Sequence, residues 1–119
     1  WMIWYKDCYA GEAIAAKKEK IKWKIQHRAG QLDIYVIALG SAEGNLLDII
    51  PSWELMQKYY PKMDMLIVGI DKGYENAMEL TGRIVTDVYK ETGTFAVKEY
   101  FLEKNRENLR KEPVWKFCS

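Results

Sequence analysis

Two short apolar runs constrain the fold of this chain more than any other feature. One spans residues 32–39 (LDIYVIAL) and the other spans residues 65–70 (MLIVGI). Both are rich in β-branched side chains, and turn-forming residues follow each of them, GSAEGN and DKGYEN. Nearly continuous apolarity is typical of parallel strands that are covered on both faces. The runs therefore predict two neighbouring parallel strands inside an α/β sheet.

The segment between these runs predicts a helix that crosses from one strand to the next. Within residues 46–60 the apolar positions recur at spacings of three and four, which places them on one helical stripe. Pro51 fits such a helix only in its first turn, and Pro61 supports a stop after the last tyrosine. A helix in this position would make a right-handed crossover between parallel strands.

The second half of the chain predicts one well-bounded helix and a third strand. Residues 74–92 carry apolar side chains along one face, and Gly93 follows as a left-handed C-terminal cap. Residues 94–102 (TFAVKEYFL) are aromatic and β-branched, which predicts a strand. Residues 103–119 are polar up to Pro113, which allows a short helix with a docked interaction tail, or a frayed end.

Residues 11–30 support two structures. As a helix, the segment places Ile14, Ile21 and Ile25 on one face, with Gly30 as its cap. As a strand, residues 20–27 (KIKWKIQH) alternate and turn through RAGQ into the first apolar run. The alanines in residues 13–16 favour the helix in the first half of the segment.

These elements predict a small single α/β domain that spans residues 1–119. The expected order is α-β-α-β-α-β, with a three-stranded, mostly parallel sheet flanked by helices and followed by a C-terminal tail. A sheet this narrow leaves edges uncovered, and self-association through the aromatic N-terminal residues Trp1, Trp4 and Tyr5 would cover them. Alternatively, these rings close the core of their own domain.

The predicted sheet also places a candidate binding site. Ligands of open parallel sheets bind beyond the carboxyl ends of the strands, which points to the loops at residues 40–45 and 71–76. The candidate ligand-binding residues are Ser41, Glu43, Asn45, Asp71 and Lys72. A phosphate or other small anion would suit helix N-termini and Lys72, whereas Glu43 and Asp71 as a pair would suit acid–base work or a hard cation. Neither loop has a dinucleotide or P-loop motif, and ordinary turns need the same residue types.

A basic segment offers a different function. Residues 17–28 (KKEKIKWKIQHR) hold six basic side chains and one tryptophan, a mixture that can hold a nucleic-acid backbone while a base stacks. The candidate residues for nucleic-acid binding are Lys20, Lys22, Trp23, Lys24 and Arg28. The opposing interpretation is a solvated helix face, because the whole chain has a formal net charge of only +1.

Other residue patterns disfavour catalysis, metals and membranes. His27 is the sole histidine, and Cys8 and Cys118 form no CxxC pair, so we expect no catalytic set, metal site or cofactor. No apolar run approaches the length of a membrane span, and the opening residues lack the features of a signal peptide, so a cytoplasmic location is expected. The leading hypothesis is a non-catalytic binding or interaction module, ahead of a small-anion protein or enzyme and a nucleic-acid-binding protein.

Overall fold

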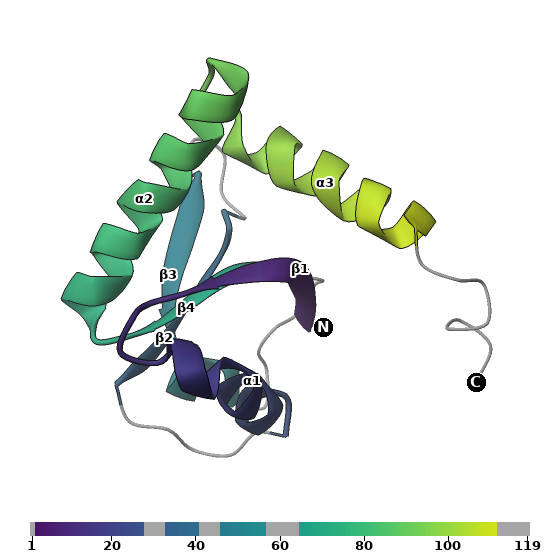
Figure 1. Cartoon of the computed structure of the whole chain (residues 1–119). Coiled ribbons are helices and arrows are strands. Elements are labelled where there is room, and N and C mark those ends of the chain that lie inside the picture. The colour runs from purple at the N-terminus through teal and green to yellow at the C-terminus, as the bar shows by residue number, and fades with distance from the viewer. Residues whose placement is uncertain (1, 28–32, 41–45, 57–64, 112–119) are drawn as a thin grey trace.

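A computed structural model of the chain describes residues 2–27, 33–40, 46–56 and 65–111 (Figure 1). In chain order the elements are β1 (Met2–Ala10), the 3₁₀ turn η1 (Ala15–Lys17), α1 (Lys18–Gln26), β2 (Ile34–Leu39), β3 (Leu47–Pro51), the 3₁₀ turn η2 (Ser52–Met56), β4 (Met65–Lys72), α2 (Tyr74–Thr92) and α3 (Val97–Lys111). The four strands form one mixed sheet in the order β1-β4-β2-β3. Among these described strands, only β1 and β4 run parallel to each other.

The predicted three-stranded, mostly parallel sheet is therefore wrong. The two apolar runs do form neighbouring buried strands, β2 and β4, but they are antiparallel, with Ile34 opposite Lys72 and Ala38 opposite Ile67. Their apolarity is explained by their central position in the sheet, where helices cover both faces. A central strand that is covered on both faces is apolar whether its neighbours are parallel or antiparallel, so the composition of the runs could not reveal the direction of the strands.

The predicted crossover helix at residues 46–60 is also wrong. Residues 47–51 form β3, an edge strand antiparallel to β2, and η2 follows at Ser52–Met56; residues 57–60 lie outside the described part of the chain. Pro51 ends the strand at the sheet edge, a position where its missing N–H disrupts no ladder. The β-branched pair Ile49 and Ile50, followed by Pro51, thus outweighs the helical spacing of the apolar residues around it.

Residues 94–102, predicted as a strand, instead lead into α3. Val97 and Phe101 are both buried and lie one helical turn apart, so this segment has a helical apolar face. Thr94 supports the start of the helix, because its hydroxyl accepts the N–H of Ala96 at 3.3 Å. In the ambiguous segment 11–30 the helical interpretation is confirmed for Lys18–Gln26, and the alternative strand at 20–27 is wrong.

The helix predicted at Tyr74–Thr92 is confirmed with its cap. Gly93 adopts a left-handed conformation, with φ of 76°, and its N–H donates to the carbonyl oxygen of Tyr89 at 2.7 Å.

β1 was not predicted, although its N-terminal aromatic residues suit a strand. Tyr5 is buried and Trp4 half-buried within the domain's own core. Self-association stays a prediction.

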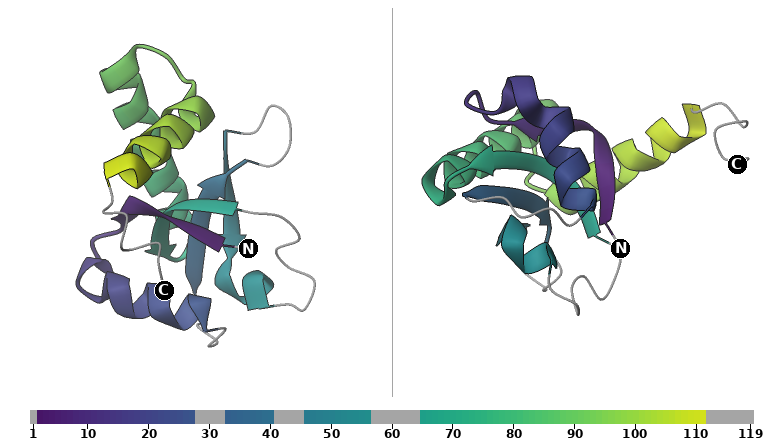
Figure 2. Two further views of the ribbon diagram at one scale, coloured as in Figure 1. Left: turned by 90° about the vertical axis from the view of Figure 1, so that its right-hand side faces the viewer. Right: turned by 90° about the horizontal axis from the view of Figure 1, so that it is seen from below.

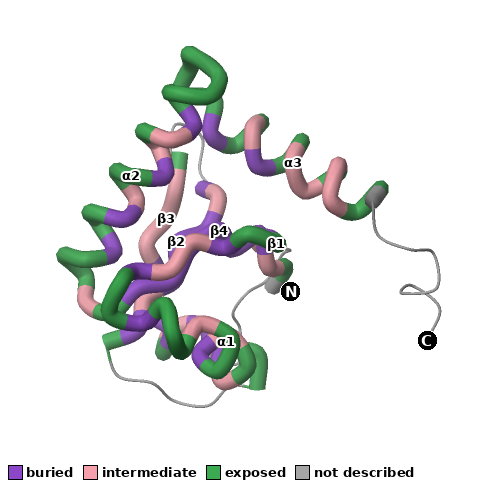
Figure 3. Tube along the Cα trace, in the orientation of Figure 1, coloured by how far each residue is buried: buried purple, intermediate pink, exposed green. Residues whose placement is uncertain are grey.

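Two clusters of buried apolar side chains lie on the two faces of the sheet. Figure 3 marks the buried residues along β4 and at intervals along α2. One cluster lies under α1 and η2 and the other under α2 and α3. Figure 1 shows α1 below β1 and β4 and α3 above them, and the left view of Figure 2 shows the same order. None of the helices in the described ranges has both the length and the apolarity needed to cross a membrane.

A β-bulge in β4 changes which face its last residues meet. Before the bulge, Leu66 and Val68 join the cluster under α2, while Ile67 joins the cluster under α1. The register then shifts, because Ile37 pairs with Gly69 but Ala38 pairs with Ile67. After the shift Ile70 faces α1, so Asp71 is turned toward α2. Bulges commonly redirect side chains beside functional sites.

Candidate functional site

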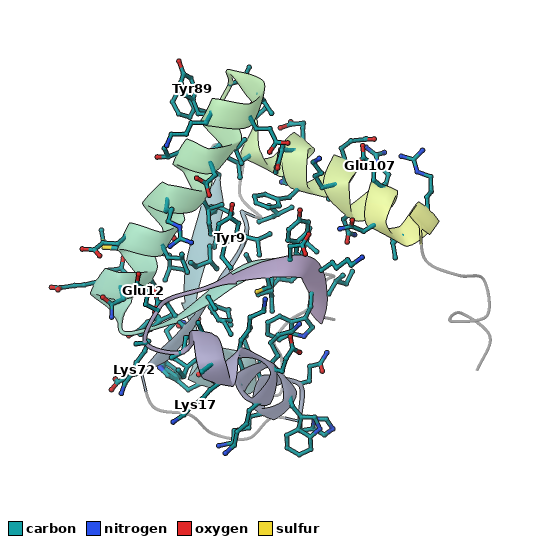
Figure 4. All side chains as sticks on the ribbon, in the orientation of Figure 1. Tyr9, Glu12, Lys17, Lys72, Tyr89 and Glu107 are labelled. Carbon is teal, nitrogen blue, oxygen red and sulfur yellow. The ribbon has the colours of Figure 1, made fainter. Side chains whose placement is uncertain are left out.

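A pocket of about 580 Å³ lies where the two parallel strands end and α2 begins. It is lined by Gly11, Glu12, Ala13, Asp71, Asn76, Glu79, Leu80 and Arg83. Figure 4 labels Glu12 just after β1, and Lys72 at the end of β4, close to the start of α2. The pocket therefore lies at the carboxyl ends of parallel strands, where ligands of α/β sheets usually bind.

Gly11 brings the chain after β1 against the end of β4. Its N–H donates to the carbonyl oxygen of Ile70 at 3.2 Å. A Cβ atom at this position would lie 2.0–2.3 Å from the carboxylate atoms of Asp71, far inside van der Waals contact. Glycine is thus required here by close packing against a carboxylate.

Asp71 is the buried ionisable side chain of the pocket, with only 4% of its surface exposed. Its Oδ1 accepts the backbone N–H of Lys72 at 2.7 Å. In the described ranges its side chain has no other hydrogen-bond or ion-pair partner. A buried carboxylate can accept several hydrogen bonds, and leaving them unmade is costly. Asp71 therefore has capacity to bind a donor that enters the pocket.

The first turns of α2 form the opposite wall. Asn76, Glu79, Leu80 and Arg83 are spaced by three and four residues, so one face of the helix turns toward Asp71. The helix start is held by the Asn76 side chain, whose Nδ2 donates to the carbonyl oxygen of Lys72 at 2.8 Å. The confirmed helix thus supplies half of the lining residues.

Tyr9 supports Arg83 from the sheet side. The Arg83 guanidinium lies over the Tyr9 ring, 5.8 Å from its centroid, and the Tyr9 hydroxyl donates to Oδ2 of Asp87 at 2.9 Å. In Figure 4 Tyr9 is labelled between β1 and α2. Burial, followed by this hydrogen bond, raises the pKa of Tyr9 to about 12, so the phenol stays neutral at physiological pH. Arg83 rests on a fixed, uncharged ring.

The structure brings only part of the sequence-predicted ligand site to this pocket. Asp71 lines it, whereas its neighbour Lys72 is exposed and is not among the lining residues. Ser41, Glu43 and Asn45 lie outside the described residues. β2 ends at Leu39, whereas Lys72 at the end of β4 pairs with Ile34 at the start of β2. The premise that the two apolar runs are parallel and end on the same side of the sheet is wrong, because β2 and β4 are antiparallel.

Sequence reasoning missed Gly11, Glu12, Glu79 and Arg83. For the first two a signal was present, since the aromatic and β-branched start of the chain followed by glycine is the pattern of a strand and its turn. Glu79 and Arg83 lie one turn apart on the helix that was predicted correctly. Without β1 in the predicted sheet, nothing indicated that this helix face had a partner.

The basic segment occupies a separate surface on α1. Lys22 is engaged within the fold: its ammonium lies 3.6 Å from Glu19 and 5.3 Å from the ring centroid of Trp4. Lys20 and Trp23 are exposed, Lys24 is half-buried, and Arg28 lies outside the described residues. The predicted nucleic-acid residues are therefore only partly available for binding.

Comparisons with known proteins add no analogy. No family model, curated protein or solved structure matches this chain. Within the described ranges, no three or more His, Cys, Asp or Glu side chains are grouped so as to hold a metal ion. The geometry and charge of the pocket must therefore carry the functional inference.

Proposed function

We propose that this domain is a non-catalytic binding module for a small polar molecule that carries an amine, held in the pocket between β1, β4 and α2. The observation that carries the proposal is the Asp71 carboxylate, which is 4% exposed, lines the pocket and packs so closely on Gly11 that no side chain fits between them. A buried carboxylate with unused acceptor capacity is suited to an ammonium group.

The charges around the pocket support a cationic group over an anionic one. Three carboxylates, those of Glu12, Asp71 and Glu79, line the pocket, against the single guanidinium of Arg83. A phosphate would meet net repulsion there, and Lys72, the cation that the sequence offered for an anion, does not line the pocket. Arg83 is suited to a carboxylate or polar oxygen elsewhere on the same ligand.

The lining residues support binding more than catalysis. They include no serine, cysteine, histidine or lysine, so among the lining residues only the carboxylates of Glu12, Asp71 and Glu79 are of a type that acts as a nucleophile or general base. The volume of about 580 Å³ is within the range of small-molecule sites. We therefore assign recognition to this pocket and no chemical step.

A thermal-shift experiment tests the proposal. The probes are free amino acids, diamines and amino sugars, with polyols, inorganic phosphate and sugar phosphates for comparison, each assayed against the protein's own ligand-free melting temperature. We expect at least one amine to stabilise the protein, since a ligand at 100 times its Kd contributes about 2.7 kcal/mol. The Asp71→Asn variant should lose this response because it replaces the carboxylate at nearly constant size.

Asp7→Asn provides the matched control, since Asp7 is exposed on β1 and does not line the pocket. It should keep the amine response in full. The proposal is overturned if phosphate compounds stabilise the protein and amines do not, if no probe of either kind has an effect, or if the two variants respond alike.

A further inference from the structure

One side of α1, on which Lys20, Trp23 and His27 are exposed and Lys24 is half-buried, combines an aromatic platform with basic side chains. Lys20, Trp23, Lys24 and His27 follow at helical spacings, away from Ile21 and Ile25, which are buried against the sheet. Trp23 is 57% exposed, an unusual position for the largest apolar side chain of the helix. Burial against the described part of the domain therefore does not account for its location.

The Trp23 indole is held in a defined orientation. It stacks on the His27 imidazole with ring centroids 3.9 Å apart and planes inclined by 20°. The imidazole is itself held by a hydrogen bond from its Nδ1 to the carbonyl oxygen of Trp23 at 2.8 Å. An aromatic ring of a ligand that stacks on this pair would find the Trp23 side chain already ordered, which lowers the entropic cost of binding.

Positive charge flanks the platform. Residues 17–24 hold five lysines and only one acidic residue, Glu19. Glu19 pairs with Lys22, while Lys20 and Lys24 have no ion pair within the described ranges. Because the chain as a whole carries a formal net charge of +1, this is a local field, suited to a few phosphates of a polyanion.

We propose that this face of α1 binds single-stranded nucleic acid, with a base stacked on Trp23 and neighbouring phosphates held by Lys20 and Lys24. Stacking on an exposed aromatic ring requires an unpaired base, which favours a single strand over a duplex. A membrane surface fits less well, because an interfacial helix buries a continuous apolar face and the isoleucines of α1 already face the sheet. This site is independent of the Asp71 pocket.

The test is fluorescence anisotropy of a short labelled oligothymidylate and an oligouridylate of the same length, with the full chain in low salt. Both should bind, and binding should weaken as salt is raised. Trp23→Ala should weaken it by about 5- to 150-fold, the range measured for loss of one base-stacking ring. The double variant Lys20→Gln, Lys24→Gln should reduce the salt slope by about 1.4, at roughly 0.7 for each phosphate contact.

Matched controls lie on the other side of the sheet. Phe95→Ala removes an aromatic ring that is 56% exposed, and Lys90→Gln with Lys98→Gln removes two charges from exposed positions. Both controls should change the affinity for the oligonucleotides by less than about twofold, which is smaller than the loss expected for Trp23→Ala. Because Trp23 is exposed, its alanine variant should keep the far-ultraviolet circular dichroism of the parent.

Three results would overturn the assignment. The first is no anisotropy change at low salt for either oligonucleotide. The second is an equal loss of affinity in the α1 variants and in the controls. The third is that the protein binds phosphatidylserine vesicles but neither oligonucleotide, and that Trp23→Ala abolishes the vesicle binding. This result would assign the α1 face to lipid.

Discussion

Replacing Gly11 by alanine tests the packing on which the pocket depends. The new Cβ atom would lie 2.0 Å from Oδ1 of Asp71 and 2.2 Å from its Cγ. Asp71 is short, buried and tied to the Lys72 N–H, so the clash cannot be relieved by rotating a flexible end. Overpacking of this kind costs about 1–3 kcal/mol in the free energy of unfolding. At roughly 3–5 °C for each kcal/mol, the melting temperature should fall by about 3–15 °C.

A double-mutant cycle identifies the cause of this loss. In an Asp71→Ala background the Cβ atom has room, and the cost of Gly11→Ala should fall to about zero, a coupling of at least 1 kcal/mol. In an Asp71→Asn background the side chain keeps its size, so the cost should remain. Comparing the cost of Gly11→Ala in these two backgrounds shows whether the cost comes from steric contact with the Asp71 side chain or from its charge. The free energies come from urea denaturation followed by circular dichroism.

Gly82→Ala serves as the control substitution. Gly82 lies within α2, and a Cβ atom there would meet nothing within 4 Å. Alanine should therefore stabilise the protein, by about 0.5–1 kcal/mol. An equal cost of Gly11→Ala in all three Asp71 backgrounds would refute the close contact between Gly11 and the carboxylate.

Three further predictions concern other parts of the fold. Gly93→Ala should cost about 1–2 kcal/mol in urea denaturation, because alanine is strained at φ of 76°; no loss would contradict the cap. The pKa of Tyr9 is about 12 in the folded protein and about 10 when unfolded, so its contribution to the free energy of unfolding is complete below about pH 10 and is lost as the pH rises through 12. Tyr9→Phe should therefore lose less stability than the parent between about pH 10 and 12. Parallel curves of stability against pH for the two proteins would contradict this prediction. Phe101 is buried, packs on Tyr5 and joins α3 to the sheet, so Phe101→Ala should lower the free energy of unfolding by about 3–5 kcal/mol. In this variant, hydrogen exchange should show that the amides of α3 lose protection before those of β4. Uniform loss of protection would argue against that role.

Local patterns predicted some elements well and others poorly. α2 and its Gly93 cap were predicted because a long amphipathic stripe and a left-handed glycine are both signals within one short segment. The start of α3 was missed because aromatic and β-branched residues there suggested a strand, whereas the tertiary contacts of Phe101 decide the outcome; a short helix after residue 102 was among the predicted alternatives, and α3 continues to Lys111. β3 was missed because a chance helical spacing surrounds a short edge strand.

The candidate site shows the same division. Asp71 was predicted as a candidate because it directly follows the apolar run at residues 65–70, and strand ends are where ligands bind. Gly11 was not predicted, because its role depends on contact with the carboxylate of Asp71, which lies far along the chain. The orientation of Asp71 depends in turn on the bulge between Ile67 and Gly69, which no periodicity in the sequence predicts.

The amino-acid sequence alone determined that the two apolar runs are buried, where the longest helix begins and ends, and that a carboxylate follows the second apolar run. Only the tertiary structure decided that β1 pairs with β4 in parallel, that β2 runs against β4, and that the pocket forms between β1, β4 and α2. Apolarity and helical periodicity report how a residue meets solvent and its near neighbours. Strand direction and partner are set by packing between distant segments, which those local signals do not contain.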